Sequence, residues 1–137
     1  MQTIEINPKT IQSAAAVIPA DSPVFMLNLL RYREHADYRG RPGEAPCSGR
    51  DAYHQRYRAA FSSIAEDSGH KLAWYGGVLA MLVGPAEEGW DEVAIVEYPS
   101  FAVYRSLVES PRYKAEADHH RRAALQDWRQ IAATRIA

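Results

Sequence analysis

Three segments rich in strand-forming residues are apolar on both of their alternating faces. In segment 23–33 one face carries Val24, Met26 and Leu30, and the other carries Phe25, Leu27 and Leu29. Segments 70–84 and 90–98 show the same continuous apolar character. A strand that packs helices on one face and meets water on the other alternates apolar with polar residues. The pattern therefore predicts a sheet with both faces buried.

The segments between these strands read as helices and turns. A short helix is expected from Pro8 to before Pro19, and a long loop over 34–49, where glycine and proline gather. A second helix is expected over 50–66 with Ser48 as its N-cap, and a third after Ser100. Pro111 begins a fourth helix that ends near Leu125, and 127–137 forms the last strand. Glycines 76 and 77 are expected to mark a β-bulge or a close approach to the backbone.

After the first helix, the predicted order is β-α-β-β-α-β. This order is typical of the ferredoxin-like α+β fold, an antiparallel sheet with both helices on one face. We expect a single domain over 1–137, with a core of about 22–136 and a helical extension of 1–21. Because the helices cover one face only, the second apolar face requires another cover. A second copy related by a two-fold axis predicts a homodimer, and the alternative is a monomer with the N-terminal helix folded over the open face.

Composition excludes several classes of partner. Sixteen basic and seventeen acidic residues leave a net charge of −1, so neither nucleic acid nor a membrane surface is an expected partner. No segment has the roughly 18 uninterrupted apolar residues of a membrane span, and the N-terminus lacks a signal-peptide pattern. The single cysteine, Cys47, cannot form a disulfide within the chain. A reducing, cytoplasmic location is expected.

The stretch "ADHHRRAAL", residues 117–125, is the part of the sequence most typical of a metal-binding or catalytic site, because it holds two histidines and two arginines in four consecutive positions. Adjacent helical residues point about 100° apart, so His119 and His120 are not expected to share a metal ion, and we predict no metal site. Arg121, Arg122 and His119 are expected on a solvated face at the basic end of a helix. Phosphate-loop, dinucleotide-binding and nucleophile-elbow motifs do not occur, so no bound cofactor is expected.

His120 is expected to face inward, because it lies on one helical stripe with Tyr113, Ala117 and Ala124. The helix over 50–66 also carries Tyr53 and Tyr57 inward, so a cavity between helices and sheet would gather these side chains. There His120 would serve as general acid or base and Tyr57 as a proton donor. The alternative is a core histidine satisfied by a tyrosine hydroxyl.

Other side chains complete the predicted pocket. Asn28 interrupts an apolar strand, so its amide either orients a ligand carbonyl or pairs across the sheet or the dimer. Arg31 is a candidate anion clamp or a solvated strand-end charge, and Trp74 is a candidate wall of the pocket or a core residue. The predicted substrate-binding set is Asn28, Arg31, Tyr53, Trp74 and Tyr113.

Several motifs resemble the DUF1330 family of small bacterial proteins. They are "PVFMLNLLRYRE", "YHQRYRAA", the "YGG" pair, "HHRRAAL" and, most specific, "WDEVAIVEYPSFAVYRSLVESPRY". The resemblance covers about residues 22–136 and implies the dimeric α/β-barrel group, whose ferredoxin-like subunits pair through their sheets. It implies no reaction, since the group includes cofactor-independent oxygenases, isomerases and haem-handling proteins.

The leading hypothesis is a dimer that binds a small carbonyl- or carboxylate-bearing molecule and transforms it without a tightly bound cofactor, by isomerisation or oxygenation. Two alternatives stand beside it. One is a small-molecule or haem-binding module, with His120 as the axial ligand, and the other is a structural dimer without a ligand. The sequence leaves open whether the chain is an enzyme.

Overall fold

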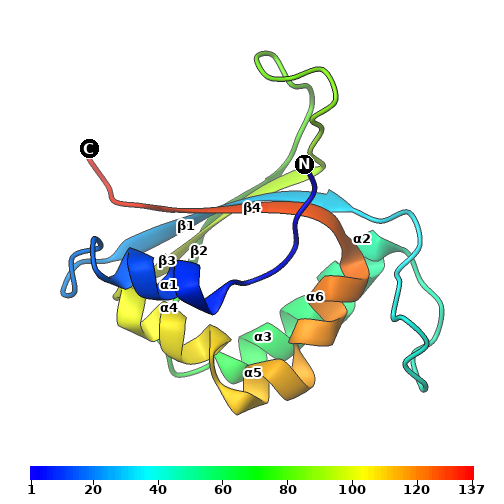
Figure 1. Cartoon of the computed structure of the whole chain (residues 1–137), viewed down its shortest axis with the longest axis horizontal. Coiled ribbons are helices and arrows are strands. Elements are labelled where there is room, and N and C mark those ends of the chain that lie inside the picture. Colours follow the sequence, from blue (N-terminus) through cyan, green and yellow to red (C-terminus); the bar gives the residue numbers. More distant parts are fainter.

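The computed structural model describes residues 1–137 and contains one four-stranded antiparallel sheet (Figure 1). The strands are β1 (Val24–Tyr32), β2 (Lys71–Gly77), β3 (Glu92–Tyr98) and β4 (Leu125–Ala133). They lie in the order β2-β3-β1-β4, so the first and third strands form the centre of the sheet. All helices lie on one side of this sheet in Figure 1. The predicted ferredoxin-like α+β fold is confirmed.

The helices also follow the predicted order. They are α1 (Pro8–Ala15), α2 (Gly49–Asp51), the π-helical segment η1 (Ala52–Tyr57), α3 (Arg58–Ile64), α4 (Phe101–Val108), α5 (Pro111–Glu116) and α6 (Asp118–Ala124). The side chains of Asn7, Ser48, Ser100 and Ser110 each accept a hydrogen bond from a backbone N–H at the start of a helix. These caps confirm the predicted starts, because each satisfies a donor that the helix itself leaves free. None of the helices has the length and apolar character needed to cross a bilayer.

The N-terminal helix does not cover the open face of the sheet. Ile11 of α1 is buried in the same core cluster as Phe101 and Tyr104 of α4, on the helical side. Met26 and Val24 of β1 complete this cluster from the sheet. The expected alternative cover for the second apolar face, α1 folded over it, is therefore not the arrangement observed.

The strand β2 is shorter than predicted. It ends at Gly77 because β3 begins only at Glu92, and beyond the hydrogen bond from Val78 N–H to the Asp91 carbonyl no strand lies opposite it. Residues 78–90 instead form a loop that projects away from the sheet on the side opposite the helices (Figure 1). Its tip is apolar, and Leu79, Leu82 and Val83 are almost fully exposed.

The bulge in β2 lies at Ala73, not at the two glycines. The pairing register with β3 shifts between Leu72 and Trp74. Gly76 has a different role, because the indole ring of Trp74 occupies the space that a Cβ atom at position 76 would need. The predicted close approach to the backbone is thus correct, and the predicted place of the bulge is wrong.

Candidate functional site

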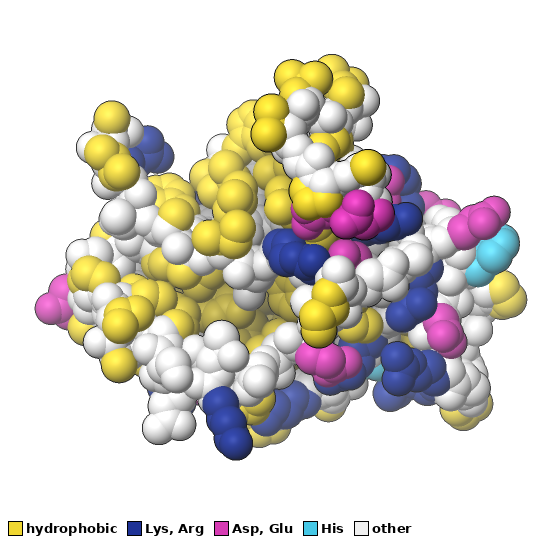
Figure 2. Space-filling model, turned by 45° about the horizontal axis from the view of Figure 1, so that its top comes forward, with side chains coloured by type: hydrophobic (Ala, Val, Ile, Leu, Met, Phe, Trp, Pro, Cys, Tyr) yellow, Lys and Arg dark blue, Asp and Glu magenta, His cyan; other side chains and the backbone are white.

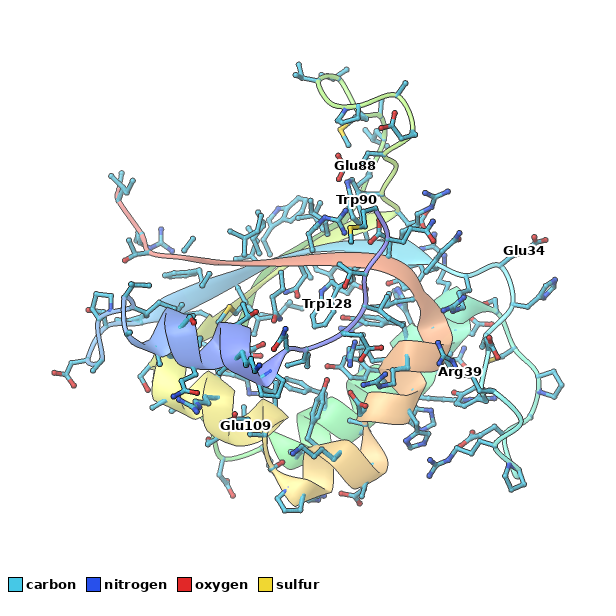
Figure 3. The ribbon with its side chains drawn as sticks, in the orientation of Figure 1. Glu34, Arg39, Glu88, Trp90, Glu109 and Trp128 are labelled. Carbon is cyan, nitrogen blue, oxygen red and sulfur yellow. The ribbon has the colours of Figure 1, made fainter.

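A cavity of about 130 Å³ lies between the helical face of the sheet and the helices. Its walls come from β1, β2, β3 and β4 on one side and from η1, α3, α4 and α5 on the other. Most of the lining is aromatic or aliphatic. The polar and charged side chains that line it are Asn28, Tyr53, Tyr57, Arg58, Ser62, His70, Tyr75, Tyr98, Tyr104, Tyr113 and Gln130. Figure 3 shows Trp128 of β4 pointing into the same space between sheet and helices.

Four of the predicted site residues meet at this cavity: Asn28, Tyr53, Tyr57 and Tyr113. Tyr53 and Tyr57 both come from η1, and their ring centroids are 4.9 Å apart. A π-helical turn is rare and occurs frequently at functional sites. The expectation that the helix over 50–66 turns its phenols toward the sheet is confirmed.

Trp74 and Arg31 lie outside the cavity. The bulge at Ala73 reverses the alternation of β2, so Trp74 joins Phe25 and Ile95 on the open face of the sheet. Arg31 alternates with buried Leu30 and Tyr32, which places its side chain on the open face as well. The prediction that these two residues line the pocket is wrong.

His120 does not face inward either. The helix predicted from Pro111 breaks at Ala117, where φ is −117°. After this break Arg121, only 1% exposed, takes the inward position. The expectation that Arg121 is solvated is therefore wrong. His120 does not line the cavity, so it cannot serve as the axial ligand of a haem bound there.

Arg121 holds the helical side of the cavity together. Its Nε donates to the hydroxyl of Tyr113 at 3.2 Å, and its other nitrogens donate to Asp118 and to the backbone carbonyl of Ile4. The Tyr113 hydroxyl is in turn hydrogen-bonded to that of Tyr57 at 3.0 Å. Burial raises the pKa of Tyr57 well above its ordinary value. Tyr57 is thus a protonated part of a closed network.

Asn28 is also satisfied within the chain. Its Nδ2 donates to the carbonyls of Met26 and Ala94, and its Oδ1 accepts from Trp128 Nε1 and Gln130 Nε2, each at 3.1 Å. Four partners use the hydrogen-bonding capacity of the amide. Of the alternatives raised by the sequence, pairing across the sheet is the one observed.

Two cavity hydroxyls remain free. The hydroxyls of Tyr53 and Tyr98 take part in none of the side-chain hydrogen bonds of the chain, and neither is among the fully enclosed polar atoms that lack a partner. Both are therefore open to the cavity. Burial raises the pKa of both phenols, so both stay protonated at neutral pH. Each can donate a hydrogen bond to an acceptor in the cavity.

His70 and Arg58, which the sequence analysis did not select, add a base and a cation. His70 Nδ1 lies 3.1 Å from the carbonyl of Ala65 and 2.9 Å from the hydroxyl of Ser68. The carbonyl can only accept, so in the tautomer that uses this contact Nδ1 carries the proton and Nε2 is free to accept one. The guanidinium of Arg58 lies 4.9 Å from the ring centroid of Tyr75 and forms no ion pair. His70 lies in none of the quoted motifs, and Arg58 lies within "YHQRYRAA" without a spacing that marks it as functional, so only the fold reveals that both line the cavity.

A carboxylate cluster adjoins the cavity through Tyr75. The Tyr75 hydroxyl donates to Glu92 at 2.6 Å, and Tyr32, His54 and Arg50 contact the same carboxylate. Burial opposes ionisation of Glu92, but these hydrogen bonds outweigh it and lower the pKa of Glu92 below its ordinary value. Glu92 is therefore an ionised anchor for the Tyr75 wall.

Comparison with known proteins identifies relatives of this fold. No family model and no curated protein matches the chain. A crystal structure of RPA0582, a protein of unknown function from Rhodopseudomonas palustris, is 32% identical with a TM-score of 0.85, over 100% of this chain and 99% of that one. The structure of methylated RPA0582 is 31% identical with a TM-score of 0.81, over 99% and 96%. The chain therefore belongs to the same protein family as RPA0582.

Proposed function

We propose that this protein binds a small apolar molecule bearing a carboxylate and a carbonyl group in the cavity between sheet and helices. The observation that carries the proposal is the set of unpaired polar groups around an aromatic wall: the Arg58 guanidinium and the hydroxyls of Tyr53 and Tyr98. Binding sites of this kind are mostly apolar with a few placed polar groups. An engineered cavity of about 150 Å³ holds a benzene molecule, so 130 Å³ suits one aromatic ring or a short 2-oxo acid.

Arg58 supports the acidic part of the ligand. It lines the cavity without a carboxylate partner of its own, and a guanidinium pairs with a carboxylate through two parallel hydrogen bonds. The phenols of Tyr53 and Tyr98 would donate to the carbonyl oxygen. The amides and phenols that are already paired would shape the cavity without holding the ligand.

We further propose that the bound molecule undergoes proton transfer without a cofactor. His70 stacks on Tyr98 with ring centroids 6.3 Å apart, so a base and a hydroxyl donor lie side by side. Nε2 of His70 would accept a proton from the carbon beside the carbonyl, and the enolate oxygen would accept a hydrogen bond from Tyr98. Return of the proton to carbon completes an isomerisation or exchange.

The binding proposal is tested by calorimetry with a panel of benzoates and 2-oxo acids, each beside its uncharged amide. We expect Arg58→Gln to weaken binding of the acids by about 10- to 100-fold, because a hydrogen bond to a charged group contributes about 1.5–3 kcal/mol, and to leave the amides unaffected. Equal binding of acids by wild type and variant contradicts the role of Arg58. Absence of binding across the panel contradicts the proposal.

The catalytic proposal has a separate readout. Deuterium exchange at C3 of 2-oxobutanoate, followed by NMR in D2O, reports proton abstraction directly. We expect His70→Gln to slow exchange by about 100-fold or more while the acid still binds. If the acid binds but its exchange is no faster than in buffer, the protein is a binding module and the catalytic proposal is contradicted.

We also propose a homodimer formed through the open faces of two sheets. Figure 2 shows apolar side chains over this face and over the loop that projects beside it. Trp74 is 54% exposed and Ile131 49% exposed, and Leu79, Leu82 and Val83 at the loop tip are almost fully exposed. A patch of this extent marks an interface, and the loop would reach across a facing copy. A cytoplasmic location forms part of the proposal, supported by the one free cysteine, Cys47.

A further inference from the structure

The loop over 34–49 is held against α6. The N–H of Asp37 donates to the Ala123 carbonyl, and the N–H of Ala36 donates to that of Cys47. Arg56 of η1 fixes the other side, since its Nη2 donates to the Ala45 carbonyl at 2.8 Å and its Nη1 to the Tyr38 hydroxyl at 3.1 Å. A loop without regular structure thus has a defined position over the helix that carries both histidines of "DHHRR".

This packing brings three ligand-type side chains together. Glu44 of the loop and His119 and His120 of α6 each offer one atom, and these atoms lie within 4.8 Å of one another. The rings of His119 and His120 have centroids only 4.0 Å apart. The two rings thus approach one another beneath the loop, although adjacent helical residues point about 100° apart.

The surrounding groups orient these ligands. The Tyr38 hydroxyl is hydrogen-bonded to Nδ1 of His120 at 2.7 Å, which leaves Nε2 as the nitrogen without a partner. Nε2 of His119 lies 3.7 Å from one oxygen of Glu44, and Arg56 holds the other oxygen at 3.5 Å. Histidine ligands in metal sites usually have such an outer hydrogen-bond partner. All three side chains are partly buried and still reachable from solvent.

We propose that Glu44, His119 and His120 form a binding site for a divalent transition-metal ion of the Zn²⁺ class. Two imidazoles and one carboxylate are the ligand set of open zinc sites, in which water fills the remaining position. Oxygen-preferring Ca²⁺ and Mg²⁺ are poor occupants, since two of the three ligands are nitrogen atoms. The site is separate from the cavity, whose lining includes none of these residues.

The charge around the site sets its strength. The negative charge of Glu44 favours a bound cation. Two positive charges lie nearby, because the guanidinium of Arg56 contacts Glu44 and the charge of Arg41 disfavours a positive charge at His119. Like charges weaken cation binding, so we expect a micromolar dissociation constant rather than that of a structural zinc site. An ion here would tie the loop to α6 and leave the core unchanged.

The test is a calorimetric titration of tag-free protein with ZnCl₂, supported by the visible absorption of bound Co²⁺. We expect one Zn²⁺ per chain, removable by EDTA. His120→Gln and Glu44→Gln should each weaken binding at least tenfold, and His35→Ala, an exposed histidine in the same loop, should bind as the wild type does. Circular dichroism and the melting temperature without metal establish that each variant is folded.

Two outcomes overturn the proposal. One is a wild-type protein that takes up no Zn²⁺ at millimolar concentration. The other is uptake that His120→Gln and Glu44→Gln leave unchanged, which would place the ion elsewhere. If Glu44→Gln does not fold, Glu44→Ala with His119→Gln gives the same comparison.

Discussion

The Tyr38 hydroxyl lies 2.7 Å from Nδ1 of His120, although 82 positions separate the two residues in the chain. Their rings meet edge to face with centroids 5.6 Å apart. This contact joins the long loop to α6 and turns His120 away from the cavity. It also divides the chemistry of the chain between a tyrosine-lined cavity and a histidine pair beneath the loop.

Replacement of Arg121 by alanine should destabilise the fold strongly. Arg121 is fully buried, and its loss removes the side-chain donor to the Ile4 carbonyl and one of the two hydrogen bonds of the Tyr113 hydroxyl. Removing one partner of a buried charged network costs about 3–5 kcal/mol. Chemical denaturation should show a drop of this size in the free energy of unfolding.

Arg122→Ala is the matched control for Arg121→Ala. Arg122 contacts the same carboxylate, Asp118, but its side chain is 39% exposed. An exposed ion pair contributes about 0–1 kcal/mol, so this variant should remain close to wild type. Similar losses in the two variants would contradict the buried position of Arg121.

Gly76→Ala should disturb β2, whereas Gly77→Ala should not. A Cβ atom at position 76 meets the indole of Trp74, and one at position 77 meets nothing within 4 Å. Overpacking of this kind costs about 1–3 kcal/mol. Thermal denaturation of both variants measures the difference, and the double variant Trp74→Ala/Gly76→Ala should lose less than the two single effects summed.

Acid should weaken the fold through Glu92. Its pKa is lowered in the folded state, so its stabilising contribution is present above the ordinary value of 4.5 and is lost as pH falls through the folded pKa. Glu92→Gln should remove this part of the pH dependence. Unfolding free energies between about pH 6 and pH 3 should fall less steeply in the variant. An equally steep decline would show that other carboxylates govern acid unfolding.

Trp74→Asp should dissociate the proposed dimer. A charge on the open face would be buried without a partner between two sheets, at a cost of several kcal/mol. Sedimentation equilibrium should give a dimer for the wild type and a monomer for this variant. Val17→Asp, which changes an 80% exposed apolar residue of the N-terminal extension, should remain dimeric. A wild-type monomer at micromolar concentration refutes the dimer.

The sequence predicted the helix starts and the central strands because N-caps and strand alternation involve only residues close together in the chain. Ser100 and Ser110 cap helices within three residues of themselves, and alternation along β1 depends only on its own backbone. The errors occur where alternation or helical periodicity is interrupted. The extra residue at Ala73 turns the Trp74 side chain to the opposite face of the sheet. The distorted turn at Ala117 gives the inward position to Arg121 in place of His120.

The sequence by itself determined the order of the elements, the antiparallel α+β class and the excess of apolar surface on the sheet. These features follow from hydrophobic periodicity and composition, which depend on residues close together in the chain. Only the tertiary structure decided which polar groups are paired and which are free. Asn28, Tyr57 and Arg121 are satisfied by partners distant in the chain, whereas Tyr53, Tyr98 and Arg58 are not. Hydrogen bonding between distant segments depends on three-dimensional contact, and no local pattern records it.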